Sequence, residues 1–228
     1  MNVLVTGAAG LIGKKISSSL KENYKVIEAD IMPDYIKLDV TNEKNVKQFF
    51  KDYNVDSVIN CAYPRTSDWA AIGPFEMSNE LFCNNVNLQL GSAFNVLKYS
   101  CQHFRNNGGG SIVFIGSVSG VMNPRFDTYE GLKMTTPIAY SAIKSGLQSM
   151  CSYMAKYLKG ENIRINVVSP SGIFDHQPEI FIERYKKYCL NKGMLDSEDL
   201  VGTIKFLISD ESKYINGQNI IIDDGFTL

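Results

Sequence analysis

The stretch that decides the fold is VLVTGAAGLIG at residues 3–13, which runs directly into KKISSSLKE at residues 14–22. The apolar run predicts a short buried strand, and residues 13–22 predict a helix. Gly7 permits the tight turn between them, Gly10 lets the backbone approach a ligand, and Gly13 lets helix and strand pack closely. The free N–H groups at the start of this helix favour a pyrophosphate, so the stretch predicts a dinucleotide site. An ordinary glycine-rich turn is the alternative.

Strands and helices alternate along the rest of the chain. Further strands are predicted by short apolar runs at 25–29, 55–60, 111–115, 163–168 and 219–222. Further helices are predicted at 42–53, 77–102, 139–158 and 196–208. Continuously apolar strands between helices are typical of a parallel sheet that is covered on both faces. We therefore predict an α/β fold in which residues 1–228 form one domain, a doubly wound parallel sheet of the Rossmann type.

The composition argues against several classes of protein. The 228 residues carry 23 Lys and Arg against 24 Asp and Glu, so there is no basic surplus for nucleic acid or for a polybasic membrane anchor. No apolar run reaches the ~18 residues of a membrane span. Five cysteines without CxxC spacing and only two histidines argue against a disulfide framework or a metal site. We expect a cytoplasmic protein that acts on a small molecule and binds no nucleic acid, membrane or metal.

Two acidic residues bear on which dinucleotide is bound. Asp30 closes the second strand, where a carboxylate accepts hydrogen bonds from the adenosine ribose hydroxyls and repels a 2′-phosphate. No Arg or Lys lies between Asp30 and Tyr35, so NAD is favoured over NADP, with mixed specificity as the alternative. Asp39 and Val40 follow a further short strand, where the carboxylate could meet the adenine amino group or simply belong to a turn.

The sequence YSAIK at residues 140–144 opens a predicted helix and places Tyr140 and Lys144 on one helix face. A free tyrosine has a pKa near ~10, and a nearby ammonium and a cationic nicotinamide ring both lower that value. Tyr140 could then exchange a proton with an alcohol or a carbonyl group. Ser117 could hold the substrate oxygen, and Asn87 could mark a polar kink that carries a relay water. Alone, this spacing also fits a solvated helix face.

The order of these motifs resembles that of the short-chain dehydrogenase/reductase family. The corresponding segments are TGAAGLIG (6–13), NCA (60–62), VNL (86–88), IGSVSG (115–120), YSAIK (140–144), NVVSP (166–170) and YINGQNIIIDDG (214–225). The resemblance implies that Tyr140 is the acid/base, Lys144 the nicotinamide-ribose ligand, Ser117 the catalytic serine and Asn87 part of the proton relay. With the residues above, it implies cofactor contacts from Gly7, Ala9, Gly10, Leu11, Ile12, Gly13, Asp30, Asp39, Val40, Asn60, Ala62, Tyr140, Lys144, Pro170, Gly172 and Ile173.

Three stretches after apolar strands, at about 63–75, 121–137 and 172–194, are expected to surround the substrate. Arg65, Arg125 and Phe174 are the candidate contacts, and either arginine could pair with a phosphate or carboxylate or be structural. The aromatic and polar residues of these stretches suit a sugar better than an acyl chain. The tract 124–144 and the segment 213–228 also resemble bacterial enzymes of flagellin-glycan and surface-polysaccharide sugar synthesis.

That resemblance implies oxidation or reduction of a sugar or sugar phosphate, on a route to a nonulosonic acid. The GxxGxxG spacing of the glycines is that of a sugar-modifying branch of the family, so an epimerase or dehydratase with tightly bound NAD is an alternative. A non-catalytic nucleotide-sensing protein is another. The family also implies a homodimer or homotetramer, formed through the helices predicted at 77–102 and 139–158.

Overall fold

The computed structural model describes residues 1–69 and 72–228, and its centre is a seven-stranded sheet in the order β3-β2-β1-β4-β5-β6-β7. The strands are β1 (Asn2–Thr6), β2 (Lys25–Asp30), β3 (Ile36–Lys37), β4 (Ser57–Asn60), β5 (Gly110–Ile115), β6 (Ile163–Pro170) and β7 (Asn219–Ile222). Every neighbouring pair is parallel. The predicted α/β fold with a doubly wound parallel sheet is confirmed.

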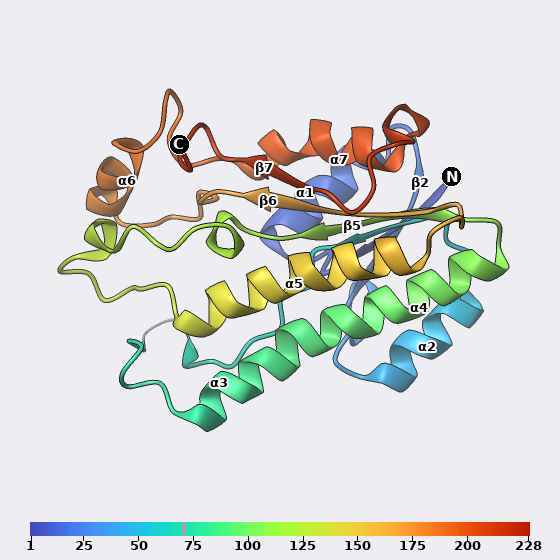
Figure 1. Ribbon diagram of the computed structural model, residues 1–228, viewed down its shortest axis with the longest axis horizontal. Helices are drawn as coiled ribbons and strands as arrows, with labels where there is room; N and C mark the ends of the chain where they lie inside the picture. Colours follow the sequence, from blue (N-terminus) through green and yellow to red (C-terminus); the bar gives the residue numbers. More distant parts are fainter. Residues whose placement is uncertain (70–71) are drawn as a thin grey trace.

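Helices cover both faces of this sheet (Figure 1). One face carries α1 (Leu11–Leu20) and α7 (Val201–Ile208), and the other carries α2 (Glu43–Asp52), α4 (Ser92–Asn106) and α5 (Ile138–Tyr157). Each face has its own apolar core, because the side chains of a buried strand alternate between the two faces. Along β1, Leu4 packs with the α2, α4 and α5 side, while Val3 and Val5 pack with the α1 and α7 side.

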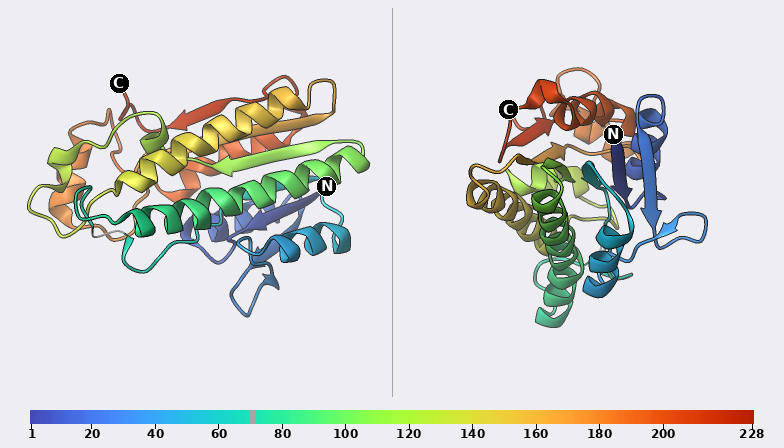
Figure 2. Two further views of the ribbon diagram at one scale, coloured as in Figure 1. Left: turned by 60° about the horizontal axis from the view of Figure 1, so that its bottom comes forward. Right: turned by 90° about the vertical axis from the view of Figure 1, so that its right-hand side faces the viewer.

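The long helix predicted at 77–102 is present, but a π-turn divides it. It comprises α3 (Asn79–Val86), a π-turn over Asn87–Gly91, and α4, which runs beside α5 (Figure 2). It begins where it does because the Ser78 side chain accepts a hydrogen bond from the Leu81 N–H. A π-turn holds one extra residue within a helix and occurs frequently at functional sites.

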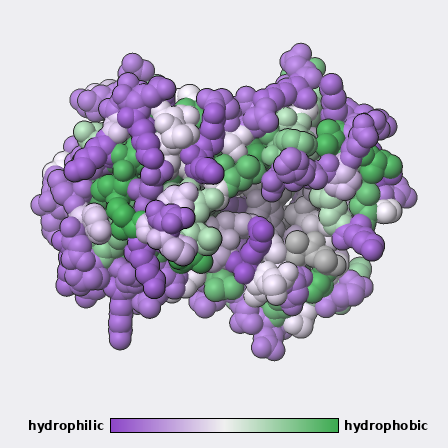
Figure 3. Space-filling view, turned by 180° about the vertical axis from the view of Figure 1, so that it is seen from behind, coloured by the Kyte–Doolittle hydropathy of each residue, from purple (hydrophilic) through white to green (hydrophobic). Residues whose placement is uncertain are grey.

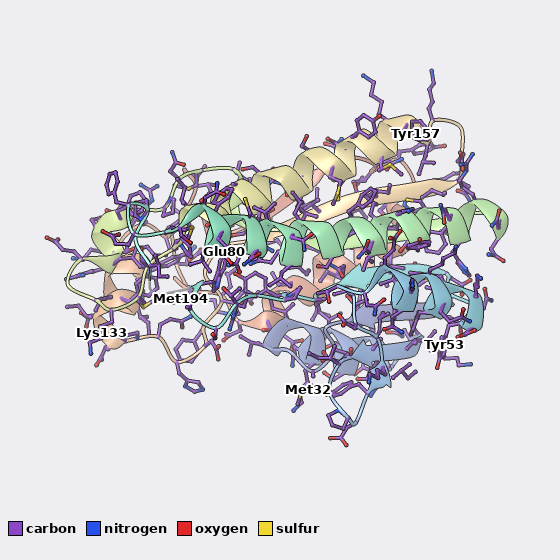
Figure 4. The ribbon with its side chains drawn as sticks, turned by 90° about the horizontal axis from the view of Figure 1, so that it is seen from below. Met32, Tyr53, Glu80, Lys133, Tyr157 and Met194 are labelled. Carbon is purple, nitrogen blue, oxygen red and sulfur yellow. The ribbon has the colours of Figure 1, made fainter. Side chains whose placement is uncertain are left out.

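The three stretches that were expected to surround the substrate lie where the strands end. Within them are a 3-10 helix at Phe126–Tyr129 and helix α6 (Glu179–Lys186); positions 70 and 71 of the first stretch lie outside the described residues. Figure 4 shows Lys133 and Met194 at this end of the molecule and Tyr53 and Tyr157 toward the other. Within the described residues, no helix combines the length and apolar character needed to cross a membrane.

Candidate active site

A cavity of about 1160 Å³ opens at the carboxyl ends of the strands. Figure 3 shows that the rear face of the molecule is hollowed near its middle. The volume exceeds that of a pocket for one drug-sized ligand, so it can hold a dinucleotide together with a small substrate. Of the residues predicted for the site, the cavity is lined by Gly7, Ala9, Gly10, Leu11, Ile12, Gly13, Asp30, Asp39, Val40, Ala62, Arg65, Ser117, Arg125, Tyr140, Lys144, Pro170, Gly172 and Ile173.

The glycine turn between β1 and α1 forms one end of this cavity. Gly7 has a φ of 64°, and a Cβ there would lie 2.6 Å from the Ala62 nitrogen. A Cβ on Gly13 would lie 2.1 Å from the Gly7 carbonyl oxygen, so strand and helix could not approach as they do. Helix α1 begins at Leu11 after Gly10, which offers no capping side chain. Its first N–H groups are therefore available to an anion such as a pyrophosphate.

Asp30 stands at the end of β2, held by backbone N–H groups on both carboxylate oxygens. Its Oδ2 accepts from the Ala9 N–H at 3.0 Å, and its Oδ1 accepts from Ile31 at 2.7 Å and Met32 at 3.2 Å. These bonds tie the carboxylate to the glycine turn and fix its direction. Asp39 is less free to contact a ligand, because its Oδ1 accepts from both the N–H and the hydroxyl of Thr41.

Lys144 and Tyr140 lie on one face of α5, as the spacing predicted. The Lys144 Nζ donates to the Ile115 carbonyl at 2.9 Å and lies 5.5 Å from the centre of the Tyr140 ring. The lysine side chain is buried. Burial lowers the pKa of Lys144 from its ordinary 10.5 to about 8, because a charged ammonium is costly to remove from water.

The pKa of Tyr140 moves in the opposite direction from the one predicted. Burial raises it above its ordinary value, while a hydrogen bond with Ser117 and the charge of Arg65 work to lower it. The sequence argument considered only the neighbouring positive charges and missed the desolvation of the phenol. The surroundings of Tyr140 fit a cationic nicotinamide ring. The positive charge of that ring would counter the rise that burial causes in the pKa of the phenol.

Two aromatic residues from the first of the three stretches, Tyr63 and Trp69, lie against Tyr140. The Tyr63 and Trp69 rings lie edge-to-face against Tyr140, with ring centres 6.0 Å and 5.6 Å from it. They also contact each other, at 5.8 Å. These rings form an apolar wall around the phenol, and this explains why the Tyr140 pKa rises.

Gly120 is a positioning residue that sequence reasoning missed. A Cβ there would lie 2.7 Å from the Lys144 carbonyl carbon, and the Ser145 hydroxyl donates to the Gly120 carbonyl at 3.0 Å. The glycine therefore lets the turn that carries Ser117 sit directly on helix α5. The motif IGSVSG contained this signal, because Gly120 comes three residues after Ser117, the serine that was expected to hold the substrate oxygen.

Three predicted site residues do not line the cavity. The Asn60 side chain instead accepts a hydrogen bond from the Thr6 hydroxyl at 2.6 Å and joins the ends of β1 and β4. Asn87 is exposed at the start of the π-turn. Phe174 is 40% exposed, and its ring centre lies 5.5 Å from that of His176 in a tilted arrangement. The sequence argument placed Asn60 and Asn87 by their match to family motifs and Phe174 by its position in a stretch after a strand, whereas the direction of each side chain depends on local backbone geometry.

Arg125 lines the cavity, but its guanidinium is engaged by the protein. It donates to the Phe226 carbonyl at 3.0 Å and lies 4.3 Å from the centre of the Tyr188 ring. Arg125 therefore connects residues 121–137 to the C-terminal segment around Phe226. This is the structural role that the sequence left open as the alternative to pairing with a phosphate or carboxylate. Arg65 forms no salt bridge within the described residues and lies 5.1 Å from the centre of the Tyr63 ring.

Comparisons with known proteins agree with this geometry. A family model described as enoyl-(acyl carrier protein) reductase matches residues 5–227. The chain is 35% identical to post-translational flagellin modification protein A of Campylobacter coli, over 99% of this chain and 98% of that protein. It is 30% identical to a 3-oxoacyl-[acyl-carrier-protein] reductase of Thermotoga maritima, over 99% and 97% of the two chains.

Among solved structures, a short chain dehydrogenase from Leptospira borgpetersenii with bound NAD+ superposes with a TM-score of 0.89 and 31% identity. That match covers 100% of this chain and 92% of the other. The chain belongs to the short-chain dehydrogenase/reductase family. It is an NAD(P)-dependent oxidoreductase of class EC 1.1.1.

Proposed function

We propose that the protein is an NAD-dependent dehydrogenase or reductase of a small polar substrate, a sugar or sugar phosphate of surface-glycan synthesis. The observation that carries this is the junction of Ser117, Tyr140 and Lys144 at one end of a cavity whose other end is the glycine turn. NAD, when bound, supplies the hydride acceptor or donor. Tyr140 would move the hydroxyl proton, while Ser117 would hold the same oxygen by a hydrogen bond.

The choice of NAD over NADP rests on the surroundings of Asp30. Its neighbours along the cavity wall are Ile31 and Met32, and neither can neutralise a 2′-phosphate. The carboxylate is fixed by three backbone N–H groups, so it cannot easily turn away from a ribose. The structure with bound NAD+ from Leptospira borgpetersenii is consistent with this choice.

The preference for a polar substrate rests on the cavity wall beyond Tyr140. The Tyr129 hydroxyl pairs with the Thr136 hydroxyl at 2.7 Å, and both residues line the cavity. Hydroxyl groups in a partly buried wall suit a ligand that itself carries hydroxyls. Arg65 adds a cation at this wall and could pair with a phosphate or carboxylate. The resemblance to a flagellin modification protein points to the same substrate class.

A screen of hexoses, hexose phosphates and nucleotide-linked sugars, followed by NADH and NADPH absorbance, tests the proposal. We expect turnover with NAD and a hydroxyl-bearing sugar, with NADH formed in proportion to product. Tight NAD binding without turnover of any compound would favour a sensing role. Product formed without net NADH would favour an epimerase or dehydratase.

The role of Arg65 has a matched test in the same screen. Arg65→Met should raise KM for a phosphorylated sugar and leave KM for its unphosphorylated form unchanged. Lys133→Met is the control, since Lys133 is a cation of a neighbouring loop that does not line the cavity. Equal effects on both sugars would contradict an anion contact at Arg65.

We also propose a homodimer or homotetramer built on α4 and α5. Phe94 is 48% exposed, and Tyr153 and Tyr157, which stack on each other, are 69% and 68% exposed. Leu147 is buried in the core and is not available to a partner. Light scattering should give a multiple of 25.5 kDa, and Phe94→Asp should reduce it to one chain. A monomeric wild-type protein would contradict this assembly. A cytoplasmic location, which free cysteines favour, stays a prediction.

A further inference from the structure

Asn85 lies in the last turn of α3, and its side chain is completely buried. Its Oδ1 accepts a hydrogen bond from the Thr66 N–H at 3.2 Å, and its Nδ2 donates to the Thr66 hydroxyl at 2.9 Å. The same Nδ2 donates to the Leu81 carbonyl, one turn earlier in the helix, at 3.0 Å. Both ends of the buried amide are therefore satisfied, and both contact one residue of the segment that follows β4. A buried polar network that is fully satisfied specifies a single geometry.

The two bonds to Thr66 are the polar connection between residues 62–69 and the helix beside them. Within the described part of the chain, no other hydrogen bond joins this segment to another element. The aromatic rings of the segment share an apolar cluster with Phe82 and Val86 of α3. Such apolar contacts are non-directional, so they do not fix the rotation of the backbone. The Asn85 amide supplies the direction that the apolar contacts lack.

Thr66 directly follows Arg65, the cation of the cavity wall. Arg65 lines the cavity, whereas Thr66 and Asn85 do not. The Arg65 guanidinium lies 5.1 Å from the centre of the Tyr63 ring, and among the described residues no salt bridge holds it. An arginine side chain has many rotamers, so a small shift of its backbone moves the guanidinium away from a bound anion. The bonds at Thr66 restrain that backbone from outside the cavity.

We infer that Asn85 is a positioning residue that sets substrate specificity: by holding Thr66, it directs the Arg65 guanidinium toward a phosphate group of the substrate. A guanidinium recognises phosphate by paired hydrogen bonds, which makes its direction important. The inference rests on the proposed function for the phosphate contact. The connection between α3 and residues 62–69 does not depend on which substrate is used.

The KM of a phosphorylated sugar, divided by that of its unphosphorylated form, measures the contact at Arg65. Asn85→Leu keeps a side chain of similar shape and removes both bonds to Thr66, so it should raise this KM ratio about tenfold, as Arg65→Met should. The kcat on the unphosphorylated sugar should change far less, whereas a general structural defect would lower kcat on both sugars. Asn84→Leu is the matched control and should keep the wild-type ratio, because Asn84 is exposed on the same helix and does not line the cavity.

Two variants of Thr66 test the same connection from the other side. Thr66→Val keeps the shape of the side chain and removes the hydroxyl that accepts from the Asn85 amide. It should raise the KM ratio by a smaller factor than Asn85→Leu, because the bond from the Thr66 N–H persists. Thr66→Ser, which keeps the hydroxyl, should avoid most of that loss. If Asn85→Leu does not fold, a wild-type KM ratio in Thr66→Val overturns the inference.

The fluorescence of Trp69, three residues after Thr66, tests the connection without any substrate. Trp69 is 4% exposed and is the single tryptophan of the chain. A buried indole emits at shorter wavelength than one in water, so Asn85→Leu should shift the emission to longer wavelength and increase quenching by acrylamide. A spectrum and quenching equal to those of the wild-type protein would show that the segment does not depend on Asn85, and would overturn the inference.

A double variant separates a role through Arg65 from an independent one. In Asn85→Leu the guanidinium is already misdirected, so adding Arg65→Met should raise the KM ratio little further. Separate effects that simply multiply, or a wild-type ratio in a folded Asn85→Leu protein, would overturn the inference. If Arg65→Met raises the ratio and Asn85→Leu does not, only the role of Asn85 fails. If Arg65→Met itself leaves the ratio unchanged, the phosphate contact of the proposed function fails, and the inference fails with it.

Discussion

Replacing Asp30 by asparagine should reduce the preference for NAD over NADP, because it should weaken the binding of NAD and strengthen the binding of NADP. Asparagine keeps the shape of the side chain and one carbonyl acceptor, so the bonds from Ile31 and Met32 to Oδ1 can persist. The charge is lost, and an amide nitrogen replaces the Oδ2 that accepts from Ala9. The variant therefore weakens the hold on the ribose hydroxyls and removes the repulsion of a 2′-phosphate.

The size of each effect follows from simple electrostatics. Two unit charges about 4 Å apart repel by about 1 kcal/mol in water and about 4 kcal/mol near a protein surface. A hydrogen bond to a charged acceptor contributes about 1.5–3 kcal/mol. Since about 1.4 kcal/mol is a factor of ten, NAD binding should weaken about tenfold and NADP binding should improve about tenfold or more.

Titration of the intrinsic fluorescence of Trp69 measures both dissociation constants, because this tryptophan contacts Tyr140 at the cavity. It is the single tryptophan of the chain, so the signal is specific. Asp30→Glu, which keeps the charge on a longer side chain, is the matched control and should still reject NADP. If the ratio of the NAD and NADP dissociation constants in Asp30→Asn equals that of the wild-type protein, the assignment of Asp30 to the ribose is refuted.

Three further variants test the geometry. Gly120→Ala would place a Cβ 2.7 Å from the Lys144 backbone and push Ser117 away, so kcat should fall about a hundredfold; an unchanged kcat would show that this turn tolerates the shift. Lys144→Met should raise the free energy of unfolding at pH 7 by up to about 3 kcal/mol, because charging Lys144, whose pKa is lowered to about 8, destabilises the native state below that pH. Wild-type stability should recover as the pH rises from about 8 to 10.5, so chemical denaturation should show the difference between the two proteins disappearing over that range; a constant difference would argue against a depressed pKa. Arg125→Met should lower the free energy of unfolding by about 1–3 kcal/mol, because it leaves the Phe226 carbonyl without its charged donor; an unchanged melting temperature in calorimetry would contradict this.

The parts of the site that sequence predicted well depend on local spacing. Gly7 and Gly13 lie next to a strand and a helix whose order fixes their role, and Tyr140 and Lys144 share a helix face wherever that helix packs. Asp30 is placed by the end of a strand. In each case a few neighbouring residues determine the geometry, so chain order is enough.

The parts that sequence could not give depend on contacts distant in the chain or on helix phase. Arg125 donates a hydrogen bond to the carbonyl of Phe226, which is about a hundred residues away in the chain, and no local sequence pattern predicts that contact. The π-turn moves Gln89 inward and leaves Asn87 outside, although the motif VNL pointed to Asn87. The rise in the Tyr140 pKa comes from the rings of Tyr63 and Trp69, which only the folded chain brings to it.

The most direct test of the central claim is the turnover of Tyr140→Phe on the sugar found in the screen, measured by NADH absorbance. Phenylalanine keeps the ring against Tyr63 and Trp69 and removes only the hydroxyl, so NAD binding and thermal stability should be retained. The account predicts that turnover falls by a factor of about a hundred to ten thousand, the range of general acid–base catalysis. Full turnover in a variant that binds NAD normally would contradict the assignment of Tyr140 as the acid/base.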